Sequence, residues 1–166
     1  MPTLEARGVE IDWSERGEGP PVLLIHETAA TGAIWDPLVD ALSKESRAIA
    51  YDRRGWGDSS EPADYRRTTI EEQSEDAAAL IESVADGPSV LCGAGVGAVI
   101  ALDLLLRRSE LVSAAVLIEP PLLVDASKVL AAQLSQSSAR EVDSAVAPPH
   151  VGAPAEVASI VAEVSL

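Results

Sequence analysis

A glycine-rich turn near the middle of the chain constrains its fold most strongly. Glycine alternates with small apolar residues in the run Gly93-Ala94-Gly95-Val96-Gly97. The preceding segment 89–92 is short and apolar, as in a strand buried on both faces, and the following segment 96–108 predicts an apolar helix that ends on two arginines. The sequence therefore predicts a tight strand-to-helix turn inside an α/β domain.

The segments before and after this turn alternate between strand and helix patterns. Continuous apolar runs at 22–26, 47–51 and 111–118 predict further buried parallel strands. Helical patterns lie within 31–46 and from residue 68 to about residue 84. The N-terminal segments 3–7 and 9–14 alternate apolar and polar residues and predict an antiparallel hairpin. Together these patterns predict a mostly parallel sheet of about six strands with flanking helices.

The regular alternation stops after residue 121. The segment 125–147 is rich in Ala, Ser and Gln and predicts one helix and a looser stretch, whereas 155–166 has the apolar stripe of a docked terminal helix. A sheet that ended with the strand 111–118 would leave an apolar edge unpaired, and such edges are usually covered or paired. We therefore expect coverage by 125–147 or a homodimer formed across that edge.

Composition and charge limit the classes of partner. A chain of 166 residues, 47% of them apolar, suits one domain and is short for two. Its 27 acidic and 12 basic residues give a net charge of −15, which disfavours nucleic acid and anionic lipid as partners. No apolar stretch reaches the roughly 18 residues of a membrane-spanning helix. With a single cysteine and no secretory pattern at the N-terminus, the sequence predicts a cytoplasmic protein.

Several motifs resemble the α/β-hydrolase superfamily in order and spacing. They are the strand that ends at His26, the pair Trp35-Asp36, the loop Tyr51-Asp52-Arg53-Arg54-Gly55-Trp56-Gly57-Asp58-Ser59, and the 93–97 turn. The resemblance covers about residues 3–122 and implies a shortened α/β-hydrolase fold. We expect one domain over 1–166, with the core match in 1–122, a reduced cap or replacement helix in 123–147, and a histidine loop and helix in 148–166. An internal deletion would explain the length.

Two positions depart from the family pattern. In that family the turn reads G-x-S-x-G and holds the nucleophilic serine above the sheet. Gly95 occupies the serine position here, and a residue without a side chain cannot attack a carbonyl. The family's His-Gly reads His26-Glu27, and a carboxylate beside an oxyanion hole would oppose the charge that the hole stabilises. The turn is similar to that of the N-myc downstream-regulated family, which is regarded as non-enzymatic.

Other candidate residues each have two interpretations. The segment around His150 resembles the family's catalytic histidine region, but a loop histidine beside prolines needs no function. Glu119 follows the strand 111–118, where it is either the catalytic acid or a hinge residue. Cys92 is expected to be a buried core thiol. The charged residues of the loop 52–58 (Asp52, Arg53, Arg54 and Asp58) are expected to form a self-bonded structural loop rather than to contact substrate.

Two functions fit these residues. The first is a degenerate α/β-hydrolase-fold protein without serine-hydrolase activity that binds a small-molecule ligand or a protein partner, with a ligand pocket and oxyanion region formed by His26, Glu27, Gly95 and Val96. The second is a hydrolase or lyase in which His150 acts as a general base on water or substrate, aided by Glu27 or Glu119, without a covalent intermediate. We expect no metal and no other cofactor in either case.

Overall fold

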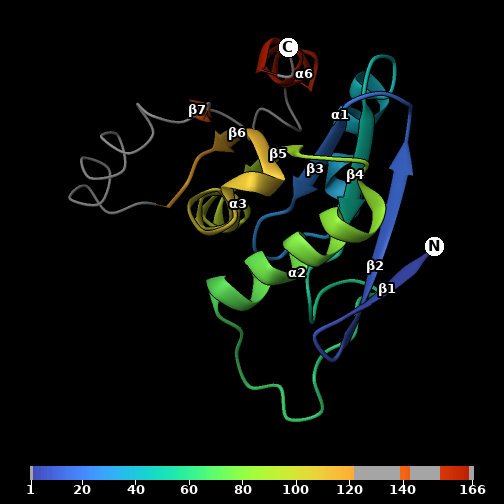
Figure 1. The fold of residues 1–166 in the computed structure, drawn as a ribbon. Coiled ribbons are helices and arrows are strands. Elements are labelled where there is room, and N and C mark those ends of the chain that lie inside the picture. The colour runs from blue at the N-terminus through green and yellow to red at the C-terminus, as the bar shows by residue number, and fades with distance from the viewer. Residues whose placement is uncertain (1, 122–138, 143–153, 165–166) are drawn as a thin grey trace.

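One mixed sheet forms the centre of the molecule. The structure, a computed structural model, describes residues 2–121, 139–142 and 154–164. Within these residues, seven strands lie in the order β1-β2-β4-β3-β5-β6-β7 (Figure 1). The strands are β1 (Thr3–Ala6), β2 (Val9–Arg16), β3 (Pro21–Ile25), β4 (Arg47–Tyr51), β5 (Ser89–Ala94), β6 (Val112–Ile118) and β7 (Ala139–Val142). β2 pairs antiparallel with β1 and β4, and all other pairs are parallel. The antiparallel N-terminal hairpin and the mostly parallel sheet agree with the prediction, whereas the β2–β4 pairing and the strand β7 were not predicted.

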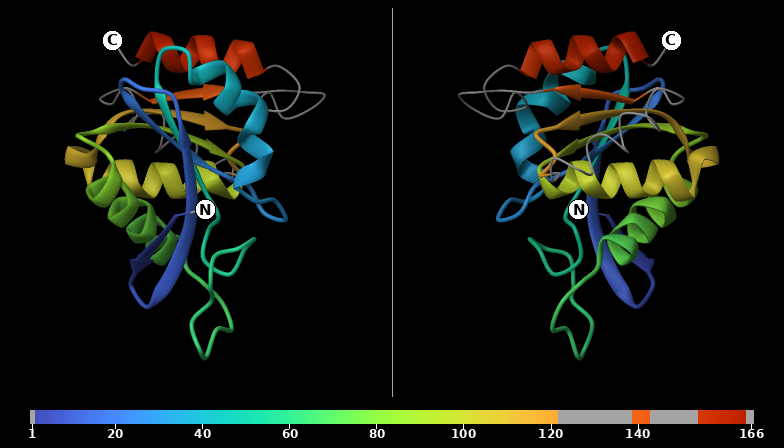
Figure 2. Two further views of the ribbon diagram at one scale, coloured as in Figure 1. Left: turned by 90° about the vertical axis from the view of Figure 1, so that its right-hand side faces the viewer. Right: turned by 90° about the vertical axis from the view of Figure 1, so that its left-hand side faces the viewer.

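Helices cover both faces of this sheet (Figures 1 and 2). α2 (Ile70–Val84) and α3 (Val96–Arg107) pack on one face, and α1 (Asp36–Leu42) and α6 (Pro154–Val164) pack on the other. The short helices η1 (Gly32–Trp35) and η2 (Ser109–Leu111) precede α1 and β6. Along β3, Leu23 and Ile25 join the first core while Val22 and Leu24 join the second. The continuous apolar run is therefore buried on both faces, as expected for a central parallel strand.

Local contacts fix the helices α2 and α6 on the two faces of the sheet. Thr69 caps α2 because its Oγ1 accepts a hydrogen bond from the backbone N–H of Glu72, while the Glu72 carboxylate accepts one from the N–H of Thr69. On the other face, α6 contacts α1, with Val157 and Val161 fully buried. The expected docked terminal helix is therefore confirmed for residues 154–164. None of the described helices is both long enough and apolar enough to cross a membrane.

The segment 125–147 differs from its prediction where the structure describes it. We expected one helix and a looser stretch, but Ala139–Val142 forms β7, which pairs with β6 at residues 115–118. The edge of β6 presents unpaired backbone groups, so a strand added there satisfies hydrogen bonds that a helix would leave open. Part of 125–147 thus covers the sheet edge, while its remaining residues lie outside the described part of the chain.

Candidate functional site at the strand-to-helix turn

The turn between β5 and α3 has the sharp geometry that the glycine pattern predicts. Gly95 begins α3 as its N-cap with φ 53° and ψ −122°, a conformation that is strained for a residue with a side chain. Its N–H donates to the carbonyl of Ile118 at 2.9 Å, which ties the turn to β6. A Cβ at Gly93 would overlap the carbonyl of Gly97, and one at Gly97 would overlap the carbonyl of Ile25. Both flanking glycines are therefore required by close packing.

Glu27 lies directly over Gly95. A Cβ built at Gly95 would lie 3.0 Å from the Cβ of Glu27 and 3.6 Å from its Oε2. The first distance is shorter than an ordinary van der Waals contact, so a side chain at position 95 would require Glu27 to shift by a few tenths of an ångström. The Glu27 side chain thus borders the space into which a side chain on this turn would extend.

His26 supports this arrangement from the interior. It is fully buried, and its Nε2 accepts a hydrogen bond from the N–H of Arg53 at 3.0 Å. This leaves Nδ1 to donate to the carbonyl of Glu27 at 2.8 Å, a tautomer that follows from the hydrogen-bond partners. Burial lowers the pKa of His26 to about 4, and the charge of Arg53 acts in the same direction. His26 is therefore neutral at pH 7 and fixes the backbone of Glu27.

Arg53 is the second support of Glu27. Its guanidinium donates to the carbonyl of Glu27 at 3.1 Å and to Oε1 of Gln73 at 2.6 Å, and it lies 5.5 Å from the ring centroid of Trp56. Burial lowers the pKa of this arginine. Sequence reasoning missed Gln73, because a lone glutamine on a predicted helix carries no signal of a contact 20 residues away.

The loop 52–59 is bonded to itself and to its neighbours, which confirms its predicted structural role. The Asp52 carboxylate accepts hydrogen bonds from the N–H of Gly32 at 2.7 Å and of Asp58 at 2.8 Å, while the Ser59 hydroxyl donates to the Asp52 carbonyl at 2.6 Å. Arg54 makes two hydrogen bonds with Asp76, at 2.5 and 2.6 Å. These hydrogen bonds raise the pKa of Arg54.

The remaining predicted residues lie at different places. Cys92 is fully buried, and burial raises the pKa of its thiol to about 12, which confirms an inert core thiol. Val96 is the first residue of α3, directly after Gly95. Glu119 is exposed at the end of β6, with the unusual φ of 48° for a residue other than glycine. His150 lies outside the described residues.

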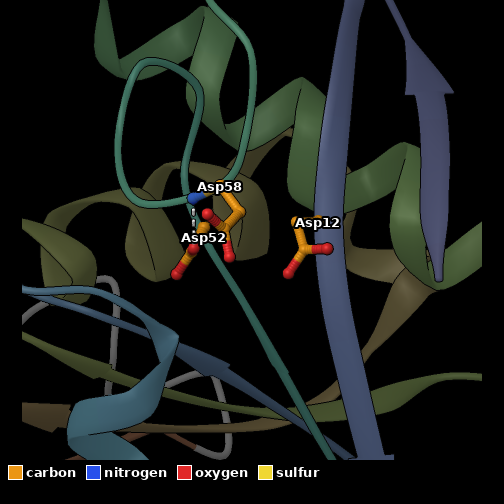
Figure 3. Close-up of side chains that lie close together, drawn as sticks. All are labelled: Asp12, Asp52 and Asp58. Carbon is orange, nitrogen blue, oxygen red and sulfur yellow. Dashed lines mark hydrogen bonds between the residues drawn. The ribbon is translucent and has the colours of Figure 1, made fainter. Parts of the chain in front are cut away.

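A group of carboxylates that sequence reasoning missed lies beside the loop 52–59. Asp12, Asp52 and Asp58 each offer an oxygen, and these three atoms lie within 4.8 Å of one another (Figure 3). Burial raises the pKa of Asp12; the N-terminal charge opposes this shift, and the charges of Asp52 and Asp58 reinforce it. Asp12 lies on β2, 40 residues before Asp52, so no local motif joins them.

Comparison with known proteins identifies the family. The family model described as the alpha/beta hydrolase fold matches residues 20–153, which is most of the chain. The chain therefore belongs to the α/β-hydrolase family. The match agrees with the β3-β5-β6 sheet order and with the sharp turn at Gly95.

Three similar proteins extend this result. The chain is 32% identical over 121 residues to the "uncharacterized hydrolase YraK" of Bacillus subtilis. The aligned residues cover 73% of this chain and 45% of that protein. The epoxide hydrolase VrEH1 from Vigna radiata superposes with a TM-score of 0.69 and 33% identity, covering 78% of this chain and 45% of that one. The enol-lactonase from Burkholderia xenovorans LB400 gives a TM-score of 0.66 and 27% identity, with coverages of 70% and 46%. The chain thus spans about half the length of these proteins.

Proposed function

We propose that this chain is an α/β-hydrolase-fold protein without serine-hydrolase activity, which binds a small molecule or a protein partner over the 93–97 turn. The observation that carries the proposal is the pair Gly95 and Glu27. Gly95 holds the backbone conformation of a nucleophile but has no attacking atom, and the Glu27 side chain lies in the space above it.

The electrostatics of the turn support the same proposal. A hydrolytic oxyanion hole presents N–H donors to a developing negative charge. Here the carboxylate of Glu27 lies within 3.6 Å of the Cβ position at residue 95, where it would repel such a charge. The backbone carbonyl of Glu27 is fixed by hydrogen bonds from His26 and Arg53, which sets the point from which this side chain extends. A ligand with hydrogen-bond donors or positive charge suits this site better than an ester carbonyl.

An alternative function keeps hydrolytic or lyase chemistry without a covalent step. It is favoured by Glu119, whose positive φ stores backbone strain at the end of β6, next to the strand residue that binds the N–H of Gly95. In this alternative, His150 acts as the general base, with Glu119 or Glu27 as the assisting carboxylate. The hydrolase names of the similar proteins point in the same direction.

Assembly and compartment are further parts of the proposal. We expect the protein to be cytoplasmic, in keeping with its reduced cysteine and its acidic composition. A homodimer across this sheet edge would have to form beyond β7, because β7 already pairs with β6 at residues 115–118. Size-exclusion chromatography with light scattering decides this point, since a strict monomer would remove the homodimer.

The test of the main proposal compares three proteins on a panel of short-chain aryl esters. We expect no turnover above the uncatalysed rate by the parent and a measurable rate from Gly95→Ser. Turnover by the parent that vanishes in His150→Ala would instead establish the alternative. Turnover by the parent that survives in both variants would overturn both functions.

A further inference from the structure

We propose that the small molecule bound over the 93–97 turn is an organic cation with N–H donors, an alkylammonium or amidinium compound, whose charged group pairs with the carboxylate of Glu27. The inference rests on the proposed function, because it takes this turn as a binding site and names the class of its ligand. Its basis is a carboxylate without a partner, which lies at the point of the sheet where α/β proteins bind ligands.

The carboxylate of Glu27 differs from those of the other half-buried acids. The hydrogen bonds found for Glu27 both reach its backbone carbonyl, and its carboxylate forms no ion pair with the part of the chain that the structure describes. The other half-buried acids within residues 2–121 each lie 3.0–3.9 Å from an arginine nitrogen; they are Glu72, Glu75 and Asp103. A partly desolvated carboxylate without a partner is unfavourable, so of these four acids Glu27 is the one that an external cation would stabilise.

Glu27 lies at the point where the strand order of the sheet reverses. β4, which follows β3 in the chain, lies on one side of β3, and β5 lies on the other (Figure 1). Glu27 comes just after the carboxyl end of β3, and Gly95 comes just after that of β5. Ligands of open α/β sheets bind outside the carboxyl ends of the strands at such a reversal. This topology is independent of the charge of Glu27 and favours a ligand at the same position.

Gly95 has no side chain to fill the position next to the Glu27 carboxylate. At the point where a Cβ of Gly95 would lie, the three nearest heavy atoms all belong to Glu27, with Oε2 at 3.6 Å. Glu27, Gly95 and Val96 are half-buried, so solvent reaches this side of the turn. A nitrogen donor over Gly95 would therefore lie beside the carboxylate. The hydrogen bonds from His26 and Arg53 fix the Glu27 carbonyl before a ligand binds, which lowers the entropic cost of binding.

An organic cation fits this carboxylate better than a metal ion does. Ca²⁺ and Mg²⁺ take about six or more oxygen ligands, whereas Glu27 offers a single carboxylate. The N–H groups of an ammonium or amidinium ion form strong charge-assisted hydrogen bonds with one carboxylate. The guanidinium of Arg53 does not take this role, because it donates to the Glu27 carbonyl and to Gln73. The net charge of −15 also concentrates cations around the protein.

Isothermal titration calorimetry with benzamidine and benzamide tests the inference, because the two probes share a shape but only benzamidine is charged at neutral pH. We expect saturable binding of benzamidine to the parent and binding of benzamide that is weaker by roughly tenfold or more. Glu27→Gln, which keeps the shape of the side chain, should weaken benzamidine binding by roughly the same factor. Glu18→Gln is the matched control, because it removes an equal charge from the exposed turn before β3, and it should bind benzamidine as the parent does.

The comparison of the two probes on the parent needs no variant, so it stands even if Glu27→Gln does not fold. Absent saturable binding of benzamidine, equal affinities for the two probes, or unchanged benzamidine affinity in Glu27→Gln would overturn the inference. Equal weakening in Glu18→Gln would also overturn it, because the cation would then respond to surface charge in general. Ester turnover by the parent would instead overturn the proposed function, so the two failures are distinguishable.

Discussion

The side chain of Glu27 lies over Gly95, with its Cβ 3.0 Å from the point that a Cβ at position 95 would occupy. The two residues follow different strands, β3 and β5, which are neighbours in the sheet. In the proposed function each removes one requirement of serine hydrolysis, because Gly95 has no side chain to act as a nucleophile and Glu27 would place negative charge at the site. Because a side chain at position 95 would meet Glu27, the two departures from the family pattern are physically coupled.

The coupling can be measured as stability. Gly95→Ala should lower the free energy of unfolding by about 1–3 kcal/mol, because the alanine must adopt a positive φ and press on Glu27. In a Glu27→Gly background the cost should fall by about 0.5 kcal/mol or more, since only the backbone strain remains. Urea unfolding of the four proteins gives the double-mutant cycle. If the two substitutions changed the free energy of unfolding in a strictly additive way, an alanine at position 95 would not be in contact with Glu27.

The flanking glycine Gly97 should tolerate no side chain. A Cβ there would overlap the carbonyl oxygen of Ile25, which is backbone and cannot move aside as a flexible side chain can. We expect Gly97→Ala to destabilise the protein by about 3 kcal/mol or more. Gly87→Ala is the matched control, because a Cβ at Gly87 meets no atom within 4 Å. Equal midpoints for the two variants in urea would show that the turn is looser than described.

His26 should make stability depend on pH. Its pKa is about 4 in the folded protein and near 6.5 when unfolded, so between these values the unfolded state binds more protons. The stabilisation is therefore complete above about pH 6.5 and is lost as the pH falls toward 4, by about 3 kcal/mol. The free-energy gap between the parent and His26→Asn should shrink over this range. A gap that is independent of pH would contradict a buried neutral histidine.

The buried pair Arg54 and Asp76 should matter more than surface ion pairs. The two side chains are 4% and 1% exposed, so Arg54→Met would leave the buried Asp76 carboxylate without its partner. We expect this change to lower the free energy of unfolding by about 3–5 kcal/mol. Arg54→Met with Asp76→Leu should recover much of this loss. Arg108→Met, which removes surface contacts with Glu82 and Glu110, should have a much smaller effect. Chemical denaturation at neutral pH compares the variants, and an equal loss in Arg108→Met would argue against burial as the cause.

The sequence predicts the sheet well because its signals are local. Continuous apolar runs such as 22–25 require burial on both faces, and the alternating glycines permit only a tight turn at 93–97. β7 could not be predicted in the same way. Its residues Ala139–Val142 have no apolar run, and what places them in the sheet is the open edge of β6, a tertiary requirement.

The site shows the same division between local and distant information. The absence of a nucleophile at Gly95 is visible in the sequence, whereas the position of Glu27 above it depends on the pairing of β3 with β5. The interior role of His26 depends on Arg53, 27 residues away. The cluster of Asp12 with Asp52 and Asp58 depends on the pairing of β2 with β4, and no sequence motif indicates that pairing.

Covalent trapping measures directly whether the turn at 93–97 carries a nucleophile. Parent, Gly95→Ser and Glu27→Gly/Gly95→Ser are treated with a fluorophosphonate, and their intact masses are measured. We expect no adduct on the parent, because neither Gly95 nor the buried Cys92 offers a reactive atom. We expect more adduct at position 95 in the double variant than in Gly95→Ser, because the Glu27 side chain no longer borders the serine. A stoichiometric adduct on the parent would contradict the claim that this protein lacks a serine-hydrolase nucleophile.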